Sequence, residues 1–262
     1  MAAISDDAGT ARGAAGIRHL QRVLWSPNEY ESPDLGSWPF TIPAVAQIVR
    51  DGGLDVPPGI TFLVGENGSG KSTLVEAIAE IYPRTGFVSP FVNVTGPGPS
   101  EEDSPLRKHL RARVTKGASP AGFFLRAETM HRYLAAIDAD ETQQRAWEGE
   151  ELQSRSHGES FLAVLRVRFA DVGVYFMDEP EAALSFRSCL GLLSLLDVLR
   201  REGSQVVVAT HSPLLASLPN ATLLELGDHG IRPVERWEDL DLVQSWRSFL
   251  EAPPRYFRHL LD

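Results

Sequence analysis

The chain has 262 residues, of which 43% are hydrophobic and 23% charged, and its formal net charge is −10 at pH 7. This length and hydrophobic content suit one α/β domain with an insertion, or two small lobes, and exclude disorder as the default. The acidic balance excludes long-range attraction of the whole surface to nucleic acid or to an anionic membrane, although a local basic patch is compatible with it.

The first residues predict a flexible tail and not a targeting sequence. Residues 1–16 are rich in Ala, Gly and Asp, and Asp6 and Asp7 stand where a signal peptide carries positive charge. No apolar run approaches the ~20 residues that cross a bilayer. The single cysteine, Cys189, cannot form an internal disulfide, and its leucine-rich surroundings predict buried packing. We therefore expect a soluble, cytoplasmic protein without direct membrane insertion.

The region up to residue 59 mixes apolar residues with turn formers. Three prolines interrupt residues 19–40, which predicts strands and turns, and residues 41–50 predict a short helix that ends at Asp51-Gly52-Gly53. The apolar run at 60–64 then predicts a strand, and residues 74–81 have helical spacing. A strand and a helix therefore flank the segment between them.

That segment matches the phosphate-loop pattern G-x-x-x-x-G-K-[ST]. Its glycines, at 65, 68 and 70, permit backbone angles that a Cβ forbids, so that successive N–H groups can surround phosphate oxygens. Lys71 and the positive end of the helix add charge for the outer phosphates, and Ser72 offers a hydroxyl to Mg²⁺. The predicted phosphate-binding residues are Gly65, Glu66, Asn67, Gly68, Ser69, Gly70, Lys71, Ser72 and Thr73.

Residues 96–160 differ in composition from what precedes them. The prolines and glycines at 96–100 break regular structure, and residues 101–155 are highly charged and mostly compatible with helix. We expect a smaller helical lobe here, between a first core part at 17–95 and a second at 161–262.

The last third predicts a parallel sheet with an α/β fold. The apolar runs at 172–177, 205–209 and 222–226 are typical of buried strands, and residues 181–201 predict a helix between the first two. Such strand–helix–strand units place their ligands at the carboxyl ends of the strands.

Side chains that could bind a metal or catalyse hydrolysis follow two of these predicted strands. Asp178 and Glu179 follow the first run, and carboxylates at the end of an apolar strand are costly unless a partner such as a phosphate-bound metal is present. Asp178 would hold Mg²⁺, and Glu179 would act as general base on the attacking water. His211 follows the next strand and would stabilise charge at the γ-phosphate. In each case an ordinary capping or turn residue is the competing interpretation.

A second anion-binding helix tip lies at Ser156-His157-Gly158-Glu159-Ser160, before the amphipathic residues 161–166. Because one molecule has one phosphate loop, this tip suggests a nucleotide held between two copies. Ser156, Gly158 and Glu159 of one copy would then cover the γ-phosphate that is bound by the other.

These elements, in this order, resemble the ATP-binding-cassette (ABC) ATPases, a family of P-loop NTPases, over most of residues 38–226. Gly65–Thr73 resembles their Walker A motif, and Asp178-Glu179 the end of Walker B. The pentapeptide at 156–160 resembles a variant signature motif, and His211 the switch histidine. More narrowly, the chain resembles small stand-alone ATPases related to chromosome-maintenance and DNA-repair heads. The resemblance implies Mg-ATP binding, ATP hydrolysis and an ATP-dependent homodimer.

The chain departs from the family pattern at several positions. His157 and Glu159 change the signature, and the segment after Pro180 lacks the usual aspartate. No clear Q-loop glutamine is present, and Glu128 is the candidate substitute, with a surface glutamate as the alternative. Trp38 or Phe40 would stack on adenine as the family's aromatic does, although each is also a candidate core residue.

The primary hypothesis is a soluble ATPase that couples its homodimer cycle to an unidentified partner, with nucleic acid as one candidate. The alternatives are the motor subunit of a membrane transporter and a nucleotide-gated module without catalysis. Two modest basic clusters bear on a nucleic-acid partner, and both are also compatible with solvated faces. They are Arg107-Lys108 with Arg111 and Arg113, and Arg255 with Arg258.

Overall fold

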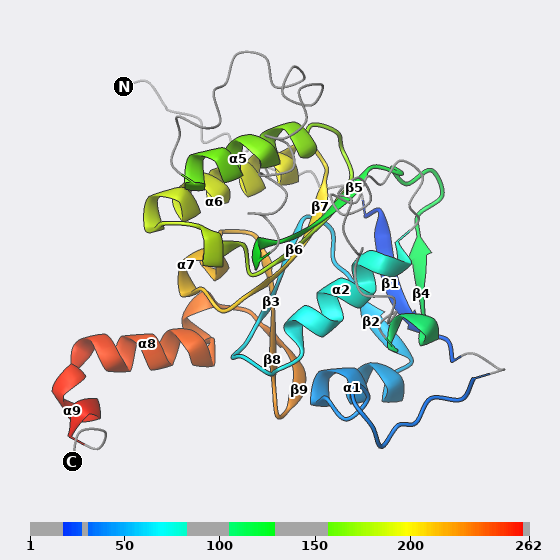
Figure 1. The fold of residues 1–262 in the computed structure, drawn as a ribbon, viewed down its shortest axis with the longest axis horizontal. Coiled ribbons are helices and arrows are strands. Elements are labelled where there is room, and N and C mark those ends of the chain that lie inside the picture. The colour runs from blue at the N-terminus through cyan, green and yellow to red at the C-terminus, as the bar shows by residue number, and fades with distance from the viewer. Residues whose placement is uncertain (1–17, 28–30, 83–104, 129–156, 259–262) are drawn as a thin grey trace, which may run out of the picture.

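The computed structural model describes residues 18–27, 31–82, 105–128 and 157–258. Within these ranges a six-stranded sheet has the order β5-β6-β7-β3-β8-β9, and a second sheet has the order β2-β1-β4 (Figure 1). The strands of the larger sheet are β3 (Ile60–Val64), β5 (Gly122–Arg126), β6 (Val174–Asp178), β7 (Gln205–Thr210), β8 (Thr222–Gly227) and β9 (Gly230–Val234).

The larger sheet is parallel except at one edge, where β9 runs antiparallel to β8. Every residue of β3, β6 and β7 is buried, as expected for apolar runs that are covered on both faces. The three predicted strands of the last third are thereby confirmed. Val64 pairs with Thr210, and Asp178 with Ala209, so these strands end side by side at one edge of the sheet.

Helices cover both faces of this sheet (Figure 1). One apolar core joins the sheet to α5 (His157–Arg168), α6 (Phe186–Arg201) and α7 (Pro213–Ala216). The other joins it to α1 (Pro43–Arg50) and α2 (Lys71–Ile81), which confirms both helices expected in the first part of the chain. After η4 (Trp237–Asp239), α8 (Asp241–Glu251) and α9 (Pro253–Phe257) extend away from the sheet.

The helix expected at 181–201 begins later than predicted. A 3₁₀ turn, η3 (Pro180–Ala183), comes first, Leu184 is extended, and the Ser185 side chain then caps α6 by accepting a hydrogen bond from the Ser188 N–H at 3.2 Å. Proline and the serine cap therefore determine where the helix starts.

The smaller sheet is antiparallel and consists of β1 (Leu20–Trp25), β2 (Gly53–Asp55) and β4 (Leu110–Val114), with η1 (Arg107–His109) leading into β4. This finding corrects the helical lobe predicted at 96–160, because β4 and β5 are strands of the two sheets. Arg111 and Arg113 are exposed and alternate with less exposed apolar neighbours, which is strand periodicity. The remainder of the predicted lobe, residues 96–104 and 129–156, lies outside the described residues.

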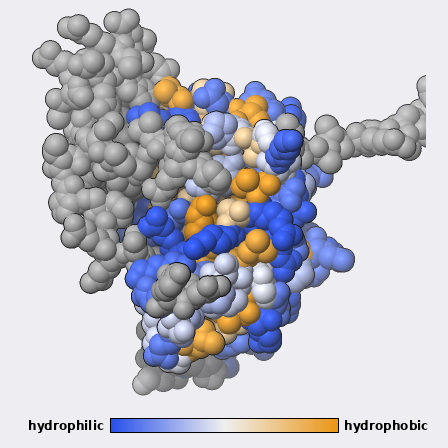
Figure 2. Space-filling model, turned by 90° about the vertical axis from the view of Figure 1, so that its right-hand side faces the viewer, coloured by the Kyte–Doolittle hydropathy of each residue, from blue (hydrophilic) through white to orange (hydrophobic). Residues whose placement is uncertain are grey.

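The surface over the smaller sheet mixes hydrophilic and hydrophobic residues in its described part (Figure 2). Cys189 is a free, buried cysteine of α6, as predicted. In the described ranges no helix combines the length and apolar character that a membrane span requires.

Candidate functional site

The phosphate loop connects β3 to α2, and two of its glycines have the predicted conformation. Gly68 and Gly70 have φ angles of 84° and 94°, a region that is unfavourable for residues with a Cβ. Gly65 is different, because its φ angle is not in this region. A Cβ there would lie 2.4 Å from the Leu226 carbonyl oxygen of β8, so glycine is needed for close packing and not for an unusual angle.

Lys71 is the first residue of α2 and is 3% exposed. Its Nζ donates a hydrogen bond to the Glu66 carbonyl oxygen at 2.8 Å and lies 3.9 Å from Glu179 Oε1. Burial lowers the pKa of Lys71, and the charges of Glu179 and Asp178 act in the opposite direction. The ammonium is therefore anchored inside the loop, next to the acidic pair.

Asp178 is the last residue of β6 and is 5% exposed. Burial raises its pKa, while a hydrogen bond with Ser72 and the charge of Arg126 oppose this rise. Its Oδ1 atom is buried and makes no well-aligned hydrogen bond within the described residues. An unsatisfied carboxylate oxygen close to a serine hydroxyl is a donor set that fits Mg²⁺, which takes one or two protein oxygens together with phosphates.

Arg126 is a further site residue, which was not predicted from the sequence. Its Nε donates to Asp178 Oδ2 at 3.2 Å, and a terminal guanidinium nitrogen donates to Glu76 Oε2 at 2.9 Å. It ends β5, where Arg126 pairs with Asp178 across the ladder. The apolar run at 123–125 was a detectable strand signal, and its end would have placed Arg126 at the active edge of the sheet.

Glu179 follows Asp178 in a left-handed conformation with a φ angle of 47°, which is unfavourable for a non-glycine residue. Its N–H donates to the Ala209 carbonyl oxygen at 2.9 Å. The Glu179 carboxylate is 31% exposed, and its Oε1 lies 3.5 Å from His211 Nδ1 as well as 3.9 Å from Lys71 Nζ. Strain at such a residue is typical of functional sites. Lys71, Glu179 and His211 therefore meet, although they come from three different strand ends.

His211 lies directly after β7, and its side chain is 43% exposed. Its backbone N–H donates to Glu181 Oε1 at 2.9 Å, and the same oxygen accepts a hydrogen bond from Thr210 Oγ1 at 2.5 Å. Glu181, in η3, therefore joins the loop after β6 to the loop after β7. Glu181 stands in the segment after Pro180 that lacks the family's aspartate, and its contact with the His211 loop has no local signal in the sequence.

The two candidates for adenine stacking lie in different environments. Phe40 is 5% exposed, and its ring packs against Trp25 and His109 with centroid distances of 5.9 and 5.7 Å, so we correct it to a core residue. Trp38 is 62% exposed. Its segment leads to Ile42, whose side chain is so near Gly70 that a Cβ on this glycine would lie 2.5 Å away. The aromatic ring of Trp38 thus belongs to a segment that borders the phosphate loop.

Other predicted site residues are described only in part. Glu128 is exposed, two residues beyond the end of β5. Gly158 lies in the first turn of α5, and a Cβ there would be 2.4 Å from Ser188 Oγ of α6, so the two helices pack closely here and a larger residue would require the Ser188 side chain to move. Ser156 and the side chain of Glu159 lie outside the described residues.

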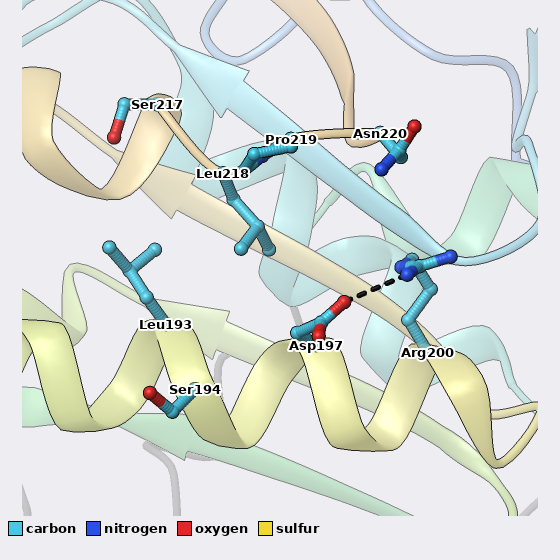
Figure 3. Close-up of a pocket in the computed structure, with 8 residues that line it drawn as sticks. All are labelled: Leu193, Ser194, Asp197, Arg200, Ser217, Leu218, Pro219 and Asn220. Atoms are coloured by element: carbon cyan, nitrogen blue, oxygen red, sulfur yellow. Dashed lines mark hydrogen bonds and ion pairs between the residues drawn. The ribbon is translucent and has the colours of Figure 1, made fainter.

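A pocket of about 480 Å³ lies elsewhere, between α6 and the turn that follows α7 (Figure 3). Leu193, Leu218 and the ion pair of Asp197 with Arg200, at 2.8 Å, are among its lining residues. None of the phosphate-loop residues lines this pocket, and neither Asp178 nor His211 does. It is therefore distinct from the edge of the sheet described above.

Comparison with known proteins identifies the family. A family model described as an AAA domain matches residues 42–82, which contain the phosphate loop. The chain is 30% identical over 225 residues to the hemin import ATP-binding protein HmuV of Burkholderia cenocepacia, covering 69% of this chain and 79% of that protein. The chain belongs to the ABC-type ATPases.

Two further similarities were found, one to a curated protein and one to a solved structure. The ATPase is 29% identical over 205 residues to the cytochrome c biogenesis ATP-binding export protein CcmA of Maricaulis maris, covering 70% of this chain and 86% of that protein. A solved ATP-binding cassette of an ABC transporter, in its ADP conformation, covers 89% of this chain with 15% identity and a TM-score of 0.47, and 97% of that cassette is matched. The two proteins matched by sequence, HmuV and CcmA, give no support to the narrower resemblance to chromosome-maintenance ATPases.

Proposed function

We propose that this ABC-type ATPase binds Mg-ATP at the carboxyl edge of the six-stranded sheet and cleaves the γ-phosphate there. The observation that carries the proposal is the approach of Lys71 Nζ and His211 Nδ1 to the same Glu179 oxygen, at 3.9 and 3.5 Å. Lys71 would neutralise the outer phosphates, while Ser72 and Asp178 would hold Mg²⁺. Phosphoryl transfer of this kind depends on positioning and on charge stabilisation.

Glu179 is the proposed general base, and His211 would stabilise the charge that develops on the γ-phosphate. Both side chains remain partly exposed, at 31% and 43%, so solvent reaches them in one copy of the chain. A second copy that covers this side would exclude water, which strengthens every electrostatic interaction in the site. We therefore propose an ATP-dependent homodimer, in which the helix start at Gly158 and its neighbours Ser156 and Glu159 face the partner's nucleotide.

Adenine stacking on Trp38 completes the proposed nucleotide site. Trp38 is exposed and belongs to the segment that reaches the phosphate loop at Ile42, and an exposed aromatic ring offers a flat apolar face to a base. Glu128 stays a prediction as the Q-loop substitute, since it follows β5 at the edge where Asp178 lies.

The cycle most consistent with the relatives is that of a transporter motor. The relatives described above are named as import and export ATP-binding proteins, and nothing in the comparisons favours a nucleic-acid partner. Half of the larger basic cluster is also paired with acidic residues, because Lys108 lies 3.1 Å from Glu31 and Arg107 lies 3.9 Å from Glu80. We propose coupling to a membrane subunit, at a cytoplasmic location.

The catalytic part is tested with Glu179→Gln, which keeps the shape of the side chain and removes its charge. We expect ATP binding to persist, phosphate release to fall by roughly 10²- to 10⁴-fold, and dimer to accumulate on a sizing column in Mg-ATP. Glu202→Gln, at an exposed position that ends α6, is the matched control and should leave all three measurements unchanged. Normal hydrolysis by Glu179→Gln would show that the assigned base is wrong.

The binding part is tested separately with Lys71→Ala. Loss of the buried ammonium should abolish ATP binding, measured by calorimetry, while circular dichroism still reports a folded chain. Unchanged affinity for ATP would reject the phosphate site.

Coupling is tested by the ATPase rate in the presence of solubilised membrane fractions, DNA or RNA. Stimulation by a membrane fraction, together with co-purification of a membrane protein, is the expected result. Stimulation by DNA or RNA alone would instead favour the nucleic-acid hypothesis, and turnover too slow to measure under all conditions would favour a nucleotide-gated module.

A further inference from the structure

Glu181 lies at the centre of the contacts that hold the His211 loop. Its Oε1 accepts hydrogen bonds from Thr210 Oγ1 at 2.5 Å and from the His211 N–H at 2.9 Å. The Glu181 side chain is 10% exposed, and Thr210 is fully buried. A carboxylate three residues after Asp178 thus fixes the backbone at the end of the neighbouring strand.

The imidazole ring of His211 faces the same carboxylate. Nδ1 lies 3.6 Å from Glu181 Oε1 and 3.5 Å from Glu179 Oε1, and it is a buried atom that makes no hydrogen bond to any residue of the described ranges. Glu181 Oε2 is also buried without a partner. A carboxylate opposite Nδ1 favours an N–H on that nitrogen and thereby determines which way Nε2 points.

A role in stability alone does not explain this choice of residue. A buried carboxylate pays a large desolvation cost, and Glu179 places a second negative charge close to the same ring nitrogen. The Thr210 hydroxyl and the His211 backbone N–H could both donate to an uncharged acceptor, so these two hydrogen bonds do not need a carboxylate. The negative charge of Glu181 is useful if the His211 ring must be held in one orientation while it acts on the substrate.

We propose that Glu181 is a positioning residue that sets both the backbone and the ring orientation of His211. It acts through His211 and does not touch the nucleotide. The proposal rests on the proposed function, because it assumes that His211 acts at the γ-phosphate. Movement of η3 would then be transmitted directly to the His211 ring.

The first test compares Glu181→Gln and Glu181→Ala with the parent chain. The amide keeps an acceptor for Thr210 and for the His211 N–H but has no charge, whereas alanine keeps neither. We expect kcat to fall about 10-fold for Glu181→Gln and about 100-fold for Glu181→Ala, because small displacements of a catalytic group are costly. The affinity for ATP should change by less than about 2-fold, since Glu181 acts on Lys71 of the phosphate loop only as one of several nearby charges, after Glu179 and Asp178.

The second test is spectroscopic and does not depend on turnover. In the ¹⁵N-histidine spectrum, His211 is assigned among the seven histidines by its absence in His211→Gln. Glu181→Gln should shift the ring nitrogen signals of His211 and leave the others in place. Thr210→Val, which removes the hydroxyl donor, should shift them in part, and Thr210→Ser, which keeps it, should not.

The outcomes separate the two proposals. If His211→Gln hydrolyses ATP normally, the proposed role of His211 fails, and with it the reason to position the ring. If His211→Gln loses turnover while folded Glu181→Gln keeps both parental kcat and parental His211 signals, the proposed function stands and the role of Glu181 is refuted. In the His211→Gln background, Glu181→Gln should cause no further loss of residual turnover, and an additional loss would also refute action through His211.

Discussion

Arg126→Leu tests the ion pair beside the proposed metal ligand. Arg126 is 29% exposed and contacts Glu76 at 2.9 Å and Asp178 at 3.2 Å, and the Asp178 side chain is 7% exposed. Leucine keeps the apolar part of the arginine side chain and removes the charge. The buried carboxylate of Asp178 then loses the guanidinium that hydrogen-bonds to it, although the charge of Lys71 still acts on it. This loss should destabilise the folded state when neither Mg²⁺ nor nucleotide is present.

The size of this expected loss of stability follows from how deeply Arg126 and its two acidic partners are buried. Two charges 3.2 Å apart attract by roughly 5 kcal/mol at an effective dielectric constant of about 20. Removing one partner of a fully buried pair costs about 3–5 kcal/mol. Because Arg126 and Glu76 each keep 29% exposure, water screens part of the interaction, so we expect a loss of about 2 kcal/mol in the free energy of unfolding.

The assay is urea unfolding followed by circular dichroism, in EDTA and again in saturating Mg-ATP. In EDTA the free energy of unfolding of the variant should be lower than that of the parent by the full ~2 kcal/mol. In Mg-ATP this difference between variant and parent should shrink, because the metal supplies a new cation to Asp178. Arg166→Leu, at an exposed position of α5, is the control and should change stability by less than about 0.5 kcal/mol. A loss below about 0.5 kcal/mol for Arg126→Leu in EDTA would refute the reasoning.

Three further predictions concern the packing at Gly65 of the phosphate loop, the stacking of adenine on Trp38, and the stability of the fold at alkaline pH. Gly65→Ala places a Cβ 2.4 Å from the Leu226 carbonyl oxygen, so we expect a loss of about 1–3 kcal/mol in urea unfolding; parental stability would contradict the close approach. Trp38→Ala should weaken ATP binding about 10-fold but leave inorganic triphosphate binding unchanged, whereas an equal loss for both ligands would place the effect at the phosphates. Burial raises the pKa of Tyr82 and Tyr175 to about 12 each, above the unfolded value of about 10. Between these values the unfolded chain loses protons first, so stability should fall by up to roughly 5 kcal/mol as pH rises through this window, and Tyr82→Phe should remove about half of that fall; an unchanged pH dependence would show that Tyr82 does not contribute.

Local patterns in the sequence determined the parts of the site that lie within single segments. The phosphate loop was predictable because its glycine spacing, its lysine and its flanking elements lie within 22 consecutive residues, 60–81. Asp178, Glu179 and His211 were predictable as strand ends, since β6 and β7 are buried on both faces and read as continuous apolar runs. Parallel pairing then places such ends at one edge of the sheet.

Only the tertiary structure decided which distant residues meet at that edge. Arg126 and Asp178 are 52 positions apart, and Glu181 and His211 are 30 apart, so their contacts depend on strand register and not on any local pattern. The charged stretch around β4 was mistaken for helix because alternating arginines on an exposed strand also fit a solvated helix face. The sequence suggested that Gly65 is needed for an unusual backbone angle. The structure shows instead that strand β8 leaves no room for a Cβ there, and β8 pairs with β3 from more than 150 residues further along the chain.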